Sequence, residues 1–193
     1  MTLVLAAAQG DSVVMCADTR VFVLAPGDNV ARVGQPNRKL FIRSGCGIVT
    51  YGSGPPGNHV PSAIDAIPND LESPEDTARA LLARFGAVAR PPQMGALVGG
   101  FQGGAAVLYR VDVAGGTVRQ ELPEFGRPAE VQTGGRPIPS GLTTEVALTP
   151  EETLERMLAI QRAVAGQTQE VGPPFEYVTL RRGQAPQKGR VDA

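Results

Sequence analysis

The chain has 193 residues, of which 42% are hydrophobic, and its 18 basic and 19 acidic side chains leave a formal net charge of −1. A chain of this length can bury one domain-sized core, and a balanced charge without a basic block excludes the usual surfaces for nucleic acid or membranes. The single histidine, His59, leaves little from which to build a metal site or a histidine-based triad. We therefore expect no nucleic-acid partner, no membrane contact, no metal and no cofactor.

The apolar runs are only as long as strands, far short of the roughly 20 residues that span a bilayer. No basic-then-apolar leader precedes Thr2, so the sequence predicts a cytoplasmic protein. Cys16 and Cys46 lie inside apolar runs, where cysteine usually behaves as a small hydrophobic side chain. We do not expect a disulfide or a redox role for either.

Two hairpins are expected in the first quarter of the chain. The apolar runs Leu3–Ala8 and Val13–Ala17 flank the turn QGDS, in which Gly and Asp are typical turn residues. A second pair, Lys39–Ile42 and Gly47–Gly52, flanks the turn RSGC. The first strand would therefore begin directly after Thr2.

Helices are predicted in two well-capped segments. Ser73 before Pro74 begins a segment with apolar residues at helical spacing, and Thr149 before Pro150 begins another that should stop near Gly166. The stretch HVPSAIDAIP is at best a short helix because its prolines restrict it. Between the helices, the stretch from MGALVGG to VRQEL indicates consecutive short strands, and FEYVTL indicates a last strand.

This order of elements fits two antiparallel sheets with helices on their outer faces, an α+β sandwich. We expect a single domain over 1–181, because no linker or internal repeat divides it. Residues 182–193 lack periodicity and apolar content, and are expected to be a disordered tail.

The position of Thr2 directly behind Met1 suggests that Thr2 could act as a catalytic nucleophile. An initiator methionine is removed when a small residue follows it, which would leave Thr2 with a free α-amine. A threonine hydroxyl is a poor nucleophile and needs a base, and an α-amine with a pKa of about 8 supplies one on the same residue.

Several segments occur in an order that resembles the proteasome β-subunit family of N-terminal nucleophile hydrolases, which includes HslV-like proteins. They are MTLVLAAAQGDSVVMCADTR, NRKLFI, TYGSG and LVGGFQGGAAVLYRVDVAGG. The resemblance runs from Thr2 to about Leu180. It implies a four-layer αββα fold and a threonine peptidase that cleaves peptides or unfolded proteins.

The resemblance assigns the catalytic roles to four residues. Thr2 would be the nucleophile, Lys39 the nearby ammonium, Asp18 the carboxylate that orients this lysine, and Gly52 the N–H donor to the oxyanion. Each has a plainer alternative: a strand residue behind a retained Met1, a surface lysine, a local ion pair of Asp18 with Arg20, and a tight turn at Gly52.

The substrate is expected to lie as an added strand along Arg20 and Val21, with Thr50 at the floor of the specificity pocket. The family also implies a homo-oligomeric ring, and an ATPase partner that the sequence does not identify. A catalytically degenerate ring subunit is the alternative function.

Three departures from the family pattern bear on activity. The spacing from Asp18 to Lys39 is about five residues longer than usual, and Gly135 and Val171 stand where the family has supporting serines; Thr168 stands where it has an aspartate. We expect slow catalysis, and a rate that rises when Ser replaces Gly135 or Val171.

Overall fold

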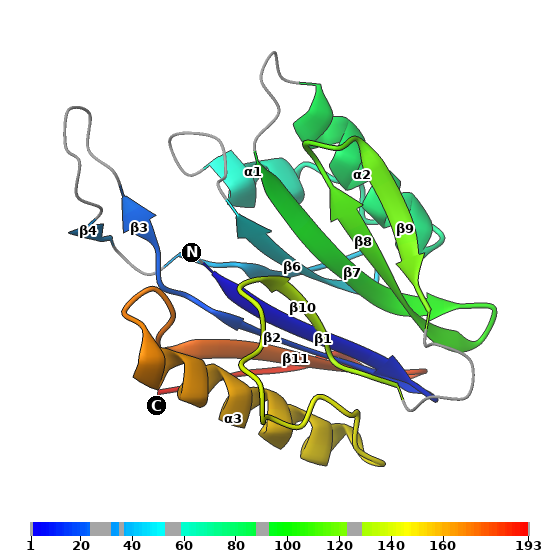
Figure 1. The fold of residues 1–193 in the computed structure, drawn as a ribbon. Coiled ribbons are helices and arrows are strands. Elements are labelled where there is room, and N and C mark those ends of the chain that lie inside the picture. Colours follow the sequence, from blue (N-terminus) through cyan, green and yellow to red (C-terminus); the bar gives the residue numbers. More distant parts are fainter. Residues whose placement is uncertain are drawn as a thin grey trace.

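The computed structural model describes residues 2–23, 32–34, 37–52, 59–87, 93–122 and 129–192. Within them, two antiparallel sheets pack face to face, and helices cover their outer faces (Figure 1). The first sheet has the order β10-β1-β2-β11-β12, with strands β1 (Leu3–Gln9), β2 (Ser12–Asp18), β10 (Gln132–Gly135), β11 (Phe175–Arg181) and β12 (Gln187–Val191). The second runs in sequence order through β5 (Leu40–Arg43), β6 (Cys46–Gly52), β7 (Met94–Gln102), β8 (Ala105–Asp112) and β9 (Thr117–Glu121).

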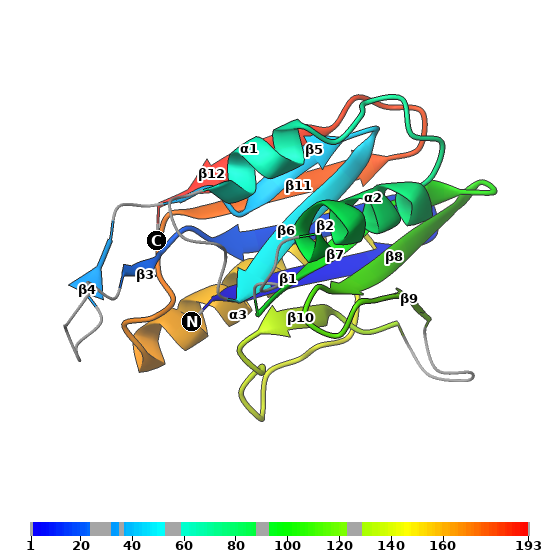
Figure 2. The ribbon, with the colours of Figure 1, turned by 90° about the horizontal axis from the view of Figure 1, so that it is seen from above.

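The helices lie outside this pair of sheets. Helix α3 (Pro150–Gln167) packs on the first sheet, whereas α1 (His59–Asp65) and α2 (Pro74–Gly86) lie on the second, as Figure 2 shows from above. A separate two-stranded ribbon joins β3 (Phe22–Val23) and β4 (Arg32–Val33). The layers therefore follow the order αββα, which confirms the predicted fold class.

Strand β1 shows how the sequence produces these layers. Its side chains alternate between the two faces of the sheet, as in any strand. Leu3, Leu5 and Ala7 belong to the core under α3, whereas Val4 and Ala6 belong to the core between the sheets. A third apolar cluster fills the space between the second sheet and helices α1 and α2. An unbroken apolar run is required because the strand is buried on both faces.

Both predicted hairpins and both well-capped helices are present. The Ser73 and Thr149 side chains accept hydrogen bonds from the N–H groups of Asp76 and Glu152, respectively, as N-caps do. Helix α3 continues one residue beyond the predicted stop, to Gln167. No helix of the described residues is long and apolar enough to cross a membrane.

The end of the chain differs from its prediction. We expected 182–193 to be disordered, but Gln187–Val191 form β12, which pairs antiparallel with β11. Backbone hydrogen bonds to the edge of β11 do not depend on apolar side chains, so composition gave no sign of this strand. Its Lys188 and Arg190 are typical of an edge strand that must not pair further.

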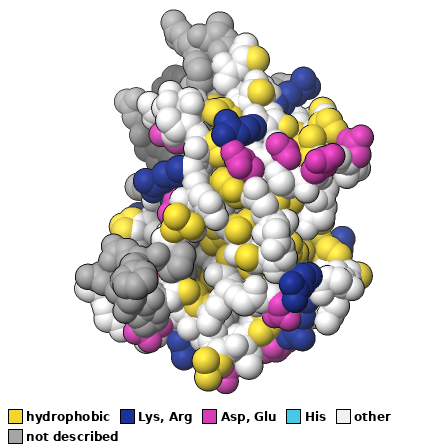
Figure 3. Space-filling model, turned by 90° about the vertical axis from the view of Figure 1, so that its right-hand side faces the viewer, with side chains coloured by type: hydrophobic (Ala, Val, Ile, Leu, Met, Phe, Trp, Pro, Cys, Tyr) yellow, Lys and Arg dark blue, Asp and Glu magenta, His cyan; other side chains and the backbone are white. Residues whose placement is uncertain are grey.

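The surface carries charges of both signs. On the face drawn in Figure 3, basic and acidic side chains are interspersed among hydrophobic ones. That arrangement agrees with the net charge of −1.

Candidate active site

Thr2 lies at the entrance to β1 and is 7% exposed. The peptide group that joins it to Leu3 is held on both sides. The Leu3 N–H donates to Asp18 Oδ1 at 2.9 Å, and the Thr2 carbonyl accepts from the Arg136 N–H at 2.9 Å. The backbone of Thr2 is therefore anchored by β2 and by the residue that follows β10.

Asp18 and Lys39 form the predicted ion pair beside this anchor. The Lys39 Nζ lies 2.9 Å from Asp18 Oδ2, and their side chains are 9% and 0% exposed. The same Oδ2 accepts from the Arg20 N–H at 3.2 Å, and Lys39 also donates to the Arg20 carbonyl. The longer spacing between Asp18 and Lys39 thus does not prevent their pairing. The structure thus pairs Asp18 with Lys39 and sets Asp18 against the peptide group between Thr2 and Leu3.

Burial changes the proton affinity of both members of this pair. Burial raises the pKa of Asp18, and the charge of Lys39 offsets part of that change. Burial likewise lowers the pKa of Lys39, against the opposing effect of Asp18. Each shift moves the group toward its neutral form, because the low-dielectric surroundings penalise charge. Lys39 is thus an ammonium that gives up its proton more readily than an exposed lysine.

Strand β6 supplies two of the predicted residues. The Thr50 N–H donates to the Lys39 carbonyl at 2.9 Å, so Thr50, which is buried, fixes the backbone of the lysine. Gly52 ends the strand with φ +89°, and a Cβ built there would lie 2.3 Å from the Gln93 carbonyl oxygen. Only glycine fits this position.

Gly135 lies against Thr2 and explains one departure from the family pattern. Its φ is +86°, and a Cβ there would lie only 2.0 Å from the Thr2 carbonyl oxygen. A serine at this position would displace the residue that it was meant to support. The structure therefore argues against our expectation that Ser at position 135 raises the rate.

Val171 belongs to the apolar core under α3 and is fully buried. A serine there would place a hydroxyl among hydrophobic side chains, where it costs free energy unless it finds a partner. Thr168 accepts a hydrogen bond from the Glu170 N–H and ends α3. The segment from Thr168 to Val171 thus caps α3 and packs against the core beneath it.

Arg20 and Val21, the predicted substrate strand, already make contacts with their neighbours. The Arg20 guanidinium donates to the Gln169 carbonyl at 2.8 Å and covers Gly172. The Val21 carbonyl accepts from the Gly34 N–H at 2.8 Å. The Arg20 side chain thus ties the segment after β2 to the loop after α3. The binding of substrate by either residue stays a prediction.

Sequence reasoning missed two further residues of this region. The Arg136 guanidinium donates to Glu170, with an Nη2–Oε2 distance of 2.5 Å, and this contact lowers the pKa of Glu170. Gln161, on α3, donates to the Leu3 carbonyl. Neither forms a recognisable motif with Thr2, because each is more than 130 residues away in sequence. Only the fold brings them together.

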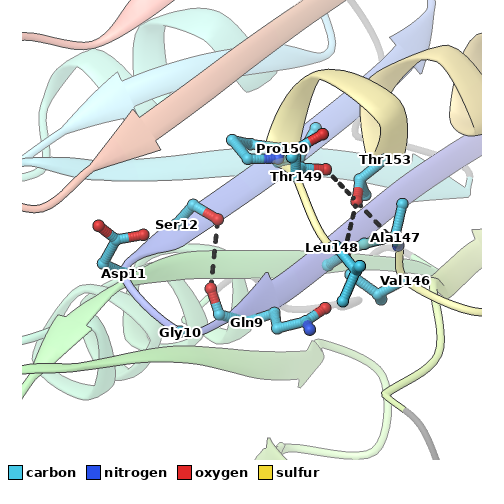
Figure 4. Close-up of a pocket in the computed structure, with 12 residues that line it drawn as sticks. Gln9, Gly10, Asp11, Ser12, Val146, Ala147, Leu148, Thr149, Pro150 and Thr153 are labelled. Atoms are coloured by element: carbon cyan, nitrogen blue, oxygen red, sulfur yellow. Dashed lines mark hydrogen bonds between the residues drawn. The ribbon is translucent and has the colours of Figure 1, made fainter.

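A cavity of about 140 Å³ lies at the other end of β1, around the turn between β1 and β2 (Figure 4). It is lined by Asp11, Ser12 and the residues that begin α3. Two hydroxyl groups drawn in Figure 4 pair locally: Ser12 donates to the Gln9 carbonyl, and Thr153 donates to the Thr149 carbonyl. We therefore take Thr2 and the Asp18–Lys39 pair as the candidate site. Among the described residues, no group of three or more His, Cys, Asp and Glu side chains could hold a metal ion.

The sequence matches no family profile, and no curated protein matches it. Its structure resembles those of Anbu proteins. Anbu from Hyphomicrobium sp. strain MC1 has a TM-score of 0.74 and 18% identity, over 100% of this chain and 88% of that one. Anbu from Yersinia bercovieri, described as an ancestral beta-subunit, has a TM-score of 0.73 and 14% identity, over 99% and 87%.

A third Anbu protein, from Pseudomonas aeruginosa, has a TM-score of 0.68 and 18% identity, over 99% of this chain and 87% of that one. It forms a helical assembly. At these identities the likeness concerns the fold. The chain has the α+β sandwich fold that the Anbu proteins share.

Proposed function

We propose that this chain is a proteasome-related threonine peptidase whose nucleophile is Thr2, exposed at the N-terminus once Met1 is removed. The observation that carries the proposal is the buried Asp18–Lys39 pair, which lies beside the peptide group that anchors Thr2. A buried ion pair costs free energy in desolvation, so it is weak evidence for stability alone. Its place next to the only candidate N-terminal nucleophile favours a catalytic role.

The reaction follows from the groups at this site. The α-amine of Thr2 takes the proton of the Thr2 hydroxyl as Oγ1 attacks the carbonyl carbon of a peptide bond. The charge of Lys39 favours the negative charge that develops, and the Gly52 N–H donates to the oxyanion. The C–N bond then breaks, the amine leaves with the proton, and water hydrolyses the ester on Thr2.

The substrate is an extended segment of a peptide or unfolded protein. It adds as a strand along Arg20 and Val21, with Thr50 below its side chain. Recognition of this kind uses backbone hydrogen bonds for affinity and pockets for specificity.

A noncatalytic role in a homo-oligomer is the second candidate. It is favoured by Gly135 and Val171, which stand where the family that the sequence resembles has supporting serines. In either case we propose that copies of this chain assemble with one another. A head-to-tail contact closes a ring or grows a helix according to its rotation, and the helical Anbu assembly makes both arrangements relevant here.

The test begins with the intact mass of the purified protein, which shows whether Met1 has been removed. Hydrolysis of small peptides is then compared between the Met1-free protein and its Thr2→Ala variant. We expect hydrolysis by the first and none by the second. Equal rates, or none in either with Thr2 confirmed as the first residue, would assign the chain to the noncatalytic role.

A further inference from the structure

Gln161 is one of two polar side chains, with Thr153, on the buried face of α3. Its neighbours one turn away, Met157 and Val164, are apolar, and Gln161 itself is 0% exposed. A buried amide costs free energy unless its polar atoms are hydrogen-bonded. The Nε2 group donates to the Leu3 carbonyl at 2.9 Å, whereas Oε1 is buried without a partner among the described residues. The Leu3 carbonyl is therefore the geometric hydrogen-bond partner of this amide, which also lies beside the buried Cys16 thiol.

That contact completes the anchoring of the chain next to Thr2. The Leu3 N–H donates to Asp18, and the Leu3 carbonyl accepts from Gln161. The Thr2 carbonyl accepts from the Arg136 N–H. Three successive backbone groups, namely the Thr2 carbonyl, the Leu3 N–H and the Leu3 carbonyl, are therefore each hydrogen-bonded. The end of a strand usually frays, but here it is fixed from β2, from α3 and from the segment after β10.

We infer that Gln161 is a positioning residue for Thr2: it fixes Leu3 from α3, so that the nucleophile keeps its place beside Asp18 and Lys39. Because a carbonyl can only accept, the Gln161 amide must present its NH₂ group to Leu3. Gln161 does not touch the reacting atoms and acts through the backbone. The inference rests on the proposed function for its kinetic part, but its structural part can be tested without activity.

The fold explains why this contact affects Thr2 in particular. Figure 1 places the C-terminal half of α3 along the first sheet, on the side where β1 begins. A misplacement of about 1 Å at a reacting group costs about 100-fold in rate. Loss of the Gln161 bond would free Leu3, and with it the residue before it.

The chain offers a matched control on the same face of α3. Thr153 lies two turns before Gln161, is 1% exposed, and bonds Ala147 and Thr149 near the other end of β1. Gln161→Met and Thr153→Val each remove one buried polar group while keeping most of the side-chain volume. Melting temperatures of both variants establish that each is folded.

Two readouts are then compared in the Met1-free protein and the two variants. We expect Gln161→Met to lower kcat about 10-fold to 100-fold with little change in KM, and Thr153→Val to leave kcat near the wild-type value. Amide hydrogen exchange of Leu3, followed by NMR, should become faster in Gln161→Met and stay unchanged in Thr153→Val.

The exchange measurement separates the two proposals. If the wild type hydrolyses no peptide, the proposed function fails, and faster exchange of the Leu3 amide in Gln161→Met alone would still support the positioning role. Equal exchange in the wild type and Gln161→Met would overturn the inference. So would an equal loss of kcat in the two variants, because it would show that any buried polar group of α3 has the same effect.

Discussion

At one end of β1, Thr2 is buried beside a carboxylate–ammonium pair; at the other end, Gln9 is exposed beside a cavity of about 140 Å³. At the cavity end, the side chains of Ser12 and Thr153 bond residues only a few positions away, although the backbone of the turn also accepts N–H groups from distant segments. At the Thr2 end, side chains 15 and 158 positions away in sequence bond the backbone of Leu3. Distant side chains and a buried ion pair therefore distinguish the Thr2 end from the cavity end.

The largest effect should follow from removing the charge at the Thr2 end. Lys39→Met is expected to lower peptide hydrolysis about 10²-fold to 10³-fold, because it removes a preorganised charge from an oxyanion-type site. It should also destabilise the fold by about 3–5 kcal/mol, since Asp18 would stay buried without its partner.

Rates and urea unfolding curves of Lys39→Met measure these two effects. Ser12→Ala, which removes a hydroxyl at the cavity end, is the control and should keep the wild-type rate. If the Lys39→Met protein is as active as the wild type, Lys39 has no role in catalysis.

The two glycines at the two ends of β1 give a second comparison. Gly10 and Gly135 both have positive φ, of +58° and +86°, but a Cβ on Gly10 would meet nothing within 4 Å. Gly10→Ala should cost about 1–2 kcal/mol for its backbone conformation alone. Gly135→Ala should cost clearly more and reduce activity, because its Cβ would overlap the Thr2 carbonyl.

Chemical denaturation of both glycine variants measures the difference. Equal losses of stability would mean that the backbone at the end of β10 shifts readily to accept a Cβ and does not fix Thr2.

Most of the fold could be predicted from the sequence, and part of the site. Apolar runs and capping residues are local signals, so the β1–β2 hairpin and helices α2 and α3 could be recognised directly. The Asp18–Lys39 pair was suggested only by family resemblance. The roles of Gly135 and Gln161 could not be predicted, because each depends on a contact between distant segments. Strand β12 was missed because its side chains are mostly exposed, so it has no apolar pattern.

The smallest effect concerns the pH dependence of stability. The folded-state pKa of Asp18 is raised above its ordinary value of 3.8, so the folded protein holds this proton more tightly than the unfolded chain does. Stability from this group is complete below pH 3.8 and is lost as pH rises through the folded-state pKa. The wild type should therefore lose stability over this range relative to Asp18→Asn/Lys39→Met, which lacks both charges.

At neutral pH the double variant should be about as stable as the wild type, because replacing a buried pair is often neutral or stabilising. Unfolding curves of both proteins between pH 4 and neutral pH measure the effect of Asp18, because the lowered pKa of Lys39 acts in the opposite sense at higher pH. A wild type that gains stability relative to the double variant as pH rises from 4 to neutral would show that the attraction within the pair outweighs its burial.

Covalent labelling of Thr2 tests the central claim most directly. An electrophile that needs both the hydroxyl and the amine of an N-terminal threonine is added to the Met1-free protein, and the adduct is located by peptide mass spectrometry. We predict an adduct on the peptide that begins with Thr2, formed fast in the wild type and much more slowly in Lys39→Met. Absence of an adduct on confirmed N-terminal Thr2, or equal labelling rates in the two proteins, would contradict the account.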